Sequence, residues 1–252
     1  MVKRRAALLL FAVAATAHAE WTIRSSDSEP GREGIAHRHV VLENANANER
    51  AVVDLAIFSA KSCTLRVIDN PTGETLSDTV PREKCAAGVN GGYFSPEFAP
   101  IGLLISGGRM IAPLQRARLI SGVLSASARG VQILRVREFS RREKISAAVQ
   151  CGPFLVDHYE LVRGLDNSAV ARRTFATVTN DRAVLGICSE ISLAELAAML
   201  TTTRLAEDLK IQRALNLDGG SSSAFWFARK DGSVFSIREQ KPVRDFVAVV
   251  PR

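Results

Sequence analysis

The 252 residues are enough for one domain with a substantial core or for two small domains, and 33 basic against 26 acidic residues give a net charge of +7. The basic residues are dispersed among acidic ones, and two tryptophans and two tyrosines offer few aromatic rings on which bases could stack. Composition therefore argues against nucleic acid as a partner.

The N-terminus has the features of a secretory signal peptide. Three basic residues at 3–5 precede an unbroken apolar run over 6–15, and Ala17-His18-Ala19 matches the small-residue pattern at which such peptides are cleaved. The apolar run is too short to span a bilayer, so a retained membrane anchor is the less favoured alternative. We expect residues 1–19 to be removed and residues 20–252 to form a periplasmic or secreted protein without a membrane anchor.

Beyond that segment the chain alternates short β-rich runs with few helices. No internal repeat, low-complexity segment or linker divides it, and Asn70-Pro71-Thr72-Gly73 and Lys230-Asp231-Gly232 are typical of turns. The pattern predicts a single α+β domain, with a mixed or antiparallel β-sheet core and a few packed helices. The predicted strands are 39–42, 51–58, 63–68, 102–105, 119–124, 131–136, 173–178, 183–188, 214–217, 224–227, 233–237 and 247–250.

Three segments are predicted to be helical. The clearest begins at Ser192, which forms a capping box with Glu195 ahead of an apolar stretch. Residues 142–149 show a weaker helical pattern. Residues 75–84 are the third candidate, although Pro81 counts against the interior of a helix.

Four cysteines follow the predicted signal peptide. Export to an oxidising compartment favours disulfides over thiols, and four cysteines allow three pairings. Cys63 and Cys85 flank one segment that contains a turn, and Cys151 and Cys188 lie in neighbouring strand-like segments. We therefore expect the pairs Cys63–Cys85 and Cys151–Cys188. Metal binding by the cysteines is less favoured, because no C-x-x-C or H-x-x-x-H spacing occurs.

Four short clusters of polar residues and glycines stand out. Each alone has a simple explanation as a turn. Two of them end a strand with a polar side chain and two glycines, and a ligand that approaches the backbone closely would use both. The clusters are GVNGGYF at 88–94, CGPFLV at 151–156, RRT at 172–174 and NLDGGS at 216–221.

In this order the clusters resemble the motifs of the phosphodiester glycosidase family. The resemblance runs from about residue 53 to residue 250, and Ser221 and Thr177 stand where the family often has glycine. It implies a hydrolase that cleaves the glycosidic bond of a sugar-1-phosphodiester. Together with the predicted signal peptide, it predicts an exported enzyme that acts on envelope or extracellular glycans. The Asn-Gly-Gly-aromatic-Phe motif matches 90–94, the Gly-Pro-aliphatic motif 152–155, the Arg-Thr pair 173–174 and the Asn-Leu-Asp-Gly-Gly motif 216–220.

The expected chemistry assigns roles to these residues. A phosphate monoester leaves as a stable anion, so the reaction makes little demand on a general acid, and the usual pair of glycosidase carboxylates is not required. Asp218 is expected to act as a base or as an electrostatic partner of the sugar cation. Arg173, or Arg172 if the strand faces the other way, is expected to hold the phosphate.

The remaining motif residues are assigned to the substrate. Asn90 completes the expected catalytic set, and its side chain and that of Asn216 are suited to hydrogen-bond sugar hydroxyls or an acetamido group. Backbone amides of the two double glycines are expected to bind phosphate or sugar oxygens. The expected substrate-binding residues are Gly91, Gly92, Gly152, Thr174, Asn216, Gly219, Gly220 and Ser221. No cofactor is implied, although Asp218 is an alternative ligand for a divalent cation that binds the phosphate.

Other interpretations stay open. Glu97 or His158, each just beyond a motif, could supply a second acid or base. Gln150-Cys151-Gly152 resembles the nucleophile segment of cysteine proteases, without the continuation typical of that class. The chain could also be an envelope module that binds glycan or protein without turnover.

Overall fold

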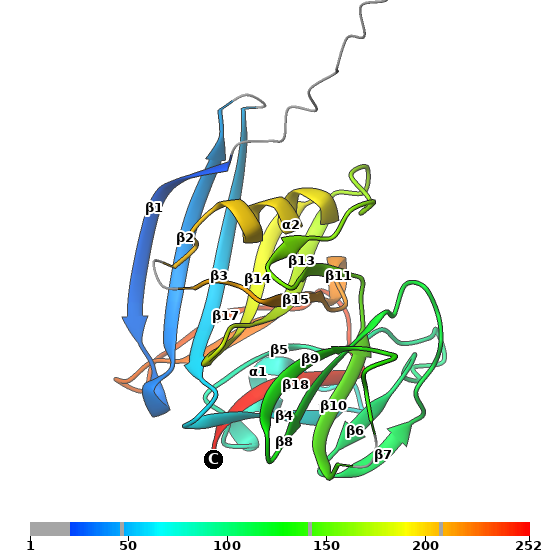
Figure 1. Cartoon of the computed structure of the whole chain (residues 1–252). Helices are drawn as coiled ribbons and strands as arrows, with labels where there is room; N and C mark the ends of the chain where they lie inside the picture. Colours follow the sequence, from blue (N-terminus) through cyan, green and yellow to red (C-terminus); the bar gives the residue numbers. More distant parts are fainter. Residues whose placement is uncertain (1–20, 46–47, 141–142, 207–208) are drawn as a thin grey trace, which may run out of the picture.

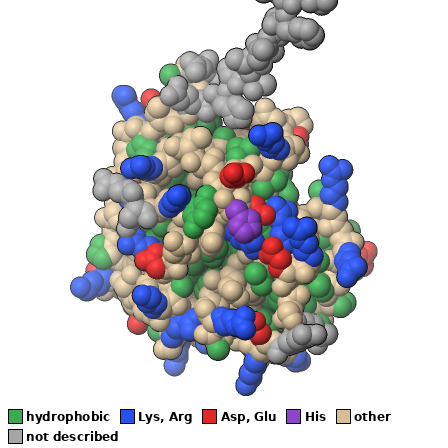
Figure 2. Space-filling model, in the orientation of Figure 1, with side chains coloured by type: hydrophobic (Ala, Val, Ile, Leu, Met, Phe, Trp, Pro, Cys, Tyr) green, Lys and Arg blue, Asp and Glu red, His purple; other side chains and the backbone are tan. Residues whose placement is uncertain are grey.

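The structure, a computed structural model, describes residues 21–45, 48–140, 143–206 and 209–252 (Figure 1). The predicted signal peptide, residues 1–19, lies outside the described residues. Among the described residues, no helix is long and apolar enough to cross a membrane. On the face shown in Figure 2, lysine and arginine side chains are spread over the surface with acidic side chains between them.

The largest sheet has eight strands in the order β1-β2-β3-β14-β13-β15-β11-β12. Successive residues of its strands face opposite sides, so that in β14 Leu185 packs into one core cluster and Val184 into another. The strands are β1 (Trp21–Pro30), β2 (Ala36–Asn44), β3 (Glu49–Ser59), β14 (Arg182–Ile191), β13 (Ala171–Val178), β15 (Arg213–Asn216), β11 (Phe154–Asp157) and β12 (Glu160–Leu161).

Two five-stranded sheets complete the fold, and all neighbouring strands are antiparallel. One sheet contains β7 (Arg109–Ala112), β6 (Leu104–Ser106), β10 (Ile145–Cys151), β8 (Gly122–Ser127) and β9 (Gly130–Arg135), in that order. The other contains β17 (Val234–Ile237), β16 (Phe225–Ala228), β5 (Ala87–Asn90), β18 (Asp245–Pro251) and β4 (Cys63–Asp69). The largest core cluster draws side chains from all three sheets.

Two α-helices cover sheet faces. Helix α2 (Leu193–Thr202) lies across the large sheet and buries Leu196 and Met199 there (Figure 1). Its predicted capping box is confirmed. The Ser192 hydroxyl accepts from the Glu195 backbone amide at 3.2 Å, and the Glu195 carboxylate accepts from the Ser192 backbone amide. Helix α1 (Leu76–Arg82) packs on the sheet that contains β5, with Pro81 in its last turn.

Every predicted strand overlaps an observed one, but the helix predicted at 142–149 is wrong. The described part of that segment enters strand β10, which pairs with β6 on one side and β8 on the other. Residues Ala147 to Cys151 are buried on both faces, so the strand shows no polar–apolar alternation, and its alanines suggested a helix. The fold is therefore more β-rich than the predicted α+β domain, since two α-helices pack on antiparallel sheets.

The two predicted disulfides are not formed, and all four cysteines are free and buried. Cys63 faces the large central core, whereas Cys85 lies with α1 on the other face of the same sheet. Cys151 and Cys188 are likewise divided between two core clusters. Proximity in the sequence suggested the pairs, but a disulfide cannot bridge side chains that a sheet separates.

Candidate active site

The predicted motifs meet where strands β5 and β15 end. The side-chain amide of Asn90, the last residue of β5, donates to the carbonyl of Asp218 at 2.7 Å. The backbone amide of Asp218 donates to the carbonyl of Gly91 at 3.0 Å. These two hydrogen bonds join the first and last motifs, although β5 and β15 belong to different sheets.

Asn90 is completely buried, and its side-chain oxygen also has two donors. The Thr174 hydroxyl donates to Asn90 Oδ1 at 2.7 Å, and the Ala224 amide donates to the same atom at 3.0 Å. The Arg-Thr pair is thereby tied to the other motifs. Since neither Asn90 nor Thr174 has exposed surface, both side chains hold the segment that carries Asp218 and do not face solvent.

The Gly-Pro motif is anchored by its carbonyl. The Tyr93 hydroxyl donates to the Gly152 oxygen at 2.7 Å, and the Asn216 side-chain amide donates to the same oxygen at 3.0 Å. A Cβ atom on Gly152 would lie 2.3 Å from the carbonyl oxygen of Leu119, so this close approach requires glycine. Gly152 and Asn216 thus brace the motifs against one another from within the protein.

Asp218 itself is half-buried at the end of β15. Its Oδ1 accepts from the Gly219 amide at 2.9 Å. Burial raises the pKa of Asp218, and the Ser222 hydroxyl, the Gly219 amide and the charge of Lys241 oppose that rise. A carboxylate with a raised pKa is a better proton acceptor near neutral pH than an exposed aspartate.

The residues after Asp218 form a tight turn with an open side. Gly220 has a φ of +63°, which side chains rarely adopt, and no atom lies within 4 Å of the place where its Cβ would be. The Ser221 carbonyl accepts from the Gln240 amide at 2.8 Å. The turn is therefore held through its backbone while the space beside Gly220 stays free.

Both arginines of the third motif lie beside this turn. A Cβ on Gly219 would come within 2.9 Å of the Arg172 oxygen and 3.9 Å of the Arg173 Cδ. A bulge between Ala171 and Arg173 interrupts the regular pairing of β13 with β14. We predicted that only one arginine would reach the site, but a bulge breaks the alternation on which that prediction rested.

The two guanidinium groups have different partners. Arg172 donates through Nε to the Gly220 oxygen and through Nη1 to the Arg238 oxygen, both at 3.3 Å. Arg173 donates through Nε to the Ile191 oxygen at 2.9 Å and through Nη2 to the Ala169 oxygen. A guanidinium has five N–H donors, so Arg173 retains donors for a phosphate.

The structure adds a second carboxylate, Asp245, which the motif analysis missed. Asp245 is 1 % exposed, accepts from the Gly92 amide at 2.9 Å through Oδ1, and has no partner for Oδ2 among the described residues. Burial raises the pKa of Asp245 to about 7, and the negative charge of Asp218 contributes to that rise. An aspartate at the start of a C-terminal strand carries no local sequence signal, which explains why it was missed.

Asp245 also explains the double glycine of the first motif. A Cβ on Gly91 would lie 1.9 Å from Asp245 Oδ1, and one on Gly92 would lie 2.8 Å from Val149 Cγ2. The Gly91 amide donates to the Asp245 carbonyl, and the Gly92 amide donates to its side chain. Both amides that we expected to bind substrate oxygens are therefore engaged within the protein.

A further cation, Lys241, was also missed. It is exposed, its Nζ lies 5.2 Å from the centre of the Phe94 ring, and its charge opposes the rise in the pKa of Asp218. Phe94 belongs to the first motif. Lys241 is therefore an exposed cation near both the first and the last motif.

The rival residues do not fit an active site. Cys151 is completely buried and burial raises the pKa of its thiol, whereas a catalytic cysteine is accessible and has a lowered pKa, so the structure does not favour the protease interpretation. His158 lies near Arg213, at the opposite end of β15 from Asp218. Glu97 is exposed in the loop beyond Phe94. No group of three or more histidine, cysteine or acidic side chains in the described part of the chain is arranged to hold a metal ion.

Comparisons with known proteins agree with the motifs. A family model described as phosphodiester glycosidase matches residues 83–250. The fold is similar to the catalytic domain of zebrafish N-acetylglucosamine-1-phosphodiester alpha-N-acetylglucosaminidase auto-inhibited by its pro-peptide, with a TM-score of 0.61 and 15% identity over 95% of this chain and 85% of that one. A hypothetical protein from Synechocystis gives a TM-score of 0.58 and 15% identity over 90% and 64% of the two chains. A search of curated proteins finds no match.

Proposed function

The chain belongs to the phosphodiester glycosidase family, and we propose that it hydrolyses the glycosidic bond of a sugar-1-phosphodiester and releases a phosphate monoester. The position of Asp218 carries this proposal. Its half-buried carboxylate lies where the family motifs meet, at an open turn, with Lys241 and two arginines nearby. Such a site combines a proton acceptor with cations that attract a phosphate.

In the proposed reaction the bond between the anomeric carbon and the bridging oxygen breaks. A water molecule supplies the new oxygen on the sugar, and Asp218 accepts the proton that this water loses. The bridging oxygen leaves with the phosphate, which is a stable anion and needs no proton at that moment. The negative charge of Asp218 also stabilises the positive charge that develops on the sugar ring.

Arg173 and Lys241 are the proposed phosphate ligands. Arg173 is held in place by two backbone carbonyls and retains free donors, whereas Lys241 is exposed and has no carboxylate partner among the described residues. Asn90, Thr174 and Asn216 act through position, because they fix the backbone on either side of Asp218.

The proposal is tested with a panel of sugar-1-phosphodiesters in water labelled with ¹⁸O. A glycosidase places the label on the sugar, whereas a phosphodiesterase that cleaves the oxygen–phosphorus bond places it on the phosphate. Mass spectrometry of both products separates the two. Label on the phosphate would contradict the proposal. Binding of the diesters without turnover of any of them would favour a glycan-binding module on the same fold.

We also propose that the protein is exported and acts on envelope or extracellular glycans. The support is the N-terminal sequence, with its basic start, apolar run and Ala17-His18-Ala19. N-terminal sequencing of protein recovered from the periplasm or the medium should begin at Glu20. Recovery of uncleaved protein from the cytoplasm would count against export.

A further inference from the structure

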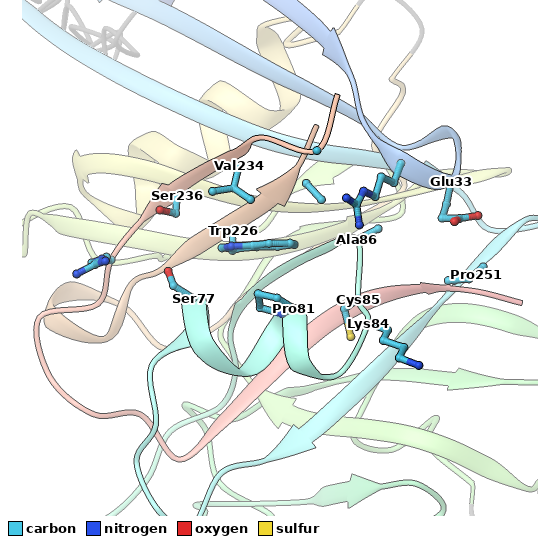
Figure 3. A pocket seen from close by; sticks show the side chains of 14 residues that line it. Glu33, Ser77, Pro81, Lys84, Cys85, Ala86, Trp226, Val234, Ser236 and Pro251 are labelled. Atoms are coloured by element: carbon cyan, nitrogen blue, oxygen red, sulfur yellow. The ribbon is translucent and has the colours of Figure 1, made fainter. Parts of the chain in front are cut away.

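A groove lies between helix α1 and strand β17 (Figure 3). Its volume is about 670 Å³. One wall is the face of β17 that carries Val234 and Ser236, and Arg238, just beyond the end of the strand, continues it at the same two-residue spacing. The other wall includes Ser77 and Pro81, one turn apart on α1.

The floor of the groove is sheet surface that α1 does not cover. Trp226 pairs with Ser236 and Ala228 pairs with Val234 in the β16–β17 ladder, so these side chains share one face. In Figure 3 the indole ring of Trp226 lies between the β17 side chains and those of α1. It is 4 % exposed, so the ring itself presents little surface to a partner.

Positive charge dominates the rim. Arg32, Lys84 and Arg238 line the groove with a single acid, Glu33. All three cations are exposed, and none forms an ion pair with any described residue. A groove rimmed by three unpaired cations is suited to a chain that carries several negative charges.

The groove begins at the edge of the candidate active site. Arg172 donates to the Gly220 oxygen in the turn after Asp218 and to the Arg238 oxygen at the end of β17. From Arg238 to Val234 the wall extends about 13 Å away from that turn, at ~3.3 Å per strand residue. Lys84 and Arg32 lie toward the far end, beside Pro251 and Gly232.

We infer that this groove binds the part of a polymeric substrate that lies beyond the cleaved bond, namely a glycan chain whose sugars are joined by phosphodiesters. The inference rests on the proposed function and deepens it. The cleaved linkage lies at Asp218, the next phosphates pair with Arg238 and then with Lys84 and Arg32, and the intervening sugars cover the floor. The repeated negative charge of such a chain matches the basic rim, and the groove is continuous with the site.

The test compares a synthetic oligomer of N-acetylglucosamine 1-phosphate, joined by phosphodiesters, with the methyl phosphodiester of the same sugar. The double variant Arg32→Gln/Lys84→Gln should raise KM for the oligomer about tenfold, because each exposed charge pair is worth up to ~1 kcal/mol and 1.4 kcal/mol is tenfold. Turnover of the monomeric diester should not change. Arg109→Gln/Lys144→Gln is the matched control, since it removes one exposed arginine and one exposed lysine outside the groove.

Binding is measured separately by intrinsic fluorescence. The chain has two tryptophans, and only Trp226 lines the groove, so the oligomer should change the emission of the wild type and not that of Trp226→Phe. A neutral N-acetylglucosamine oligomer and inorganic polyphosphate are the comparison ligands. Equal binding of polyphosphate would show a site for charge alone and overturn the assignment to a glycan.

The two proposals fail in different ways. If the wild type hydrolyses the monomer but the groove variant has an unchanged KM for the oligomer, the inference is wrong and the proposed function stands. If no diester is hydrolysed, the proposed function fails. The fluorescence measurement then tests the groove by itself. If the wild type binds the oligomer and the double variant does not, the inference is supported. If the wild type does not bind the oligomer, the inference is wrong.

Discussion

The backbone amide of Gly92 donates a 2.9 Å hydrogen bond to Oδ1 of Asp245, a residue 153 positions further along the chain. This contact gives the double glycine of the first motif a structural reason. The carboxylate occupies the space where the Cβ of Gly91 would lie, and it is buried with one oxygen unpartnered among the described residues. A carboxylate in such surroundings costs stability whenever it is ionised.

Asp245→Asn should therefore stabilise the protein at pH 8. Burial raises the pKa of Asp245 to about 7, whereas an unfolded aspartate has a pKa of about 3.9. Its contribution to stability is thus fully present below about pH 4 and is lost as the pH rises to about 7. The variant should gain at least ~1.4 kcal/mol at pH 8, the value of one pKa unit, and little at pH 4. Denaturant unfolding at both pH values measures this, and an equal effect at both would contradict it.

Gly91→Ala should destabilise the protein by about 1–3 kcal/mol, because the added methyl overlaps Asp245 Oδ1. Truncating the Asp245 side chain should relieve the overlap. The double variant Gly91→Ala/Asp245→Ala should therefore lose less stability than the sum of the losses in the two single variants. Thermal unfolding of the four proteins completes the cycle. Additive losses would show that the two residues do not interact.

Asp218→Asn should reduce turnover of a sugar-1-phosphodiester at least ~100-fold, the typical effect of a positioned proton-transfer group. The amide keeps the size of the side chain and an oxygen that accepts from Gly219, so the melting temperature should not fall. Because burial raises the pKa of Asp218, the wild-type rate should increase with pH as this carboxyl ionises. Wild-type turnover by Asp218→Asn would remove Asp218 from the mechanism.

Arg173→Lys should weaken binding of the phosphodiester about tenfold, because an ammonium cannot hold two backbone carbonyls and a phosphate at once. Arg172→Lys is the matched comparison. Arg172 ties Gly220 to Arg238, so its loss should lower the melting temperature together with activity. If only Arg172→Lys raised KM, and did so without lowering the melting temperature, Arg172 would be the phosphate ligand and Arg173 the structural residue.

The four cysteines should titrate as thiols only after unfolding. Burial raises the pKa of Cys85 to about 11 and that of Cys188 to about 12, and it also raises the pKa of Cys63 and Cys151. A thiol reagent should find no reactive cysteine in the native protein and four in denaturant without reductant. If two or fewer thiols react in denaturant, the protein contains at least one disulfide and this prediction is wrong.

Local sequence was sufficient to predict a residue's structural role wherever that role depends on its neighbours along the chain. The capping box at Ser192 involves a residue three positions away, and the strands of the large sheet were recognised from short apolar runs rich in β-branched residues. The motif around Asp218 was equally readable, because a carboxylate, two glycines and a flanking strand occur together in the sequence. These features let the sequence by itself determine the family, most strands and the position of the carboxylate that we place at the centre of the site.

Only the tertiary structure decided which distant residues share a space. Strand β10 is buried on both faces and contains two adjacent alanines, so neither an alternation nor a run of β-branched residues identified it as a strand. Cys63 and Cys85 are near in sequence but face opposite sides of one sheet. Asp245 meets Gly91 and Gly92 because β18 pairs with β5, and no residue beside Asp245 signals that pairing. Which face a side chain occupies, and which strand lies beside it, depends on the packing of the whole chain.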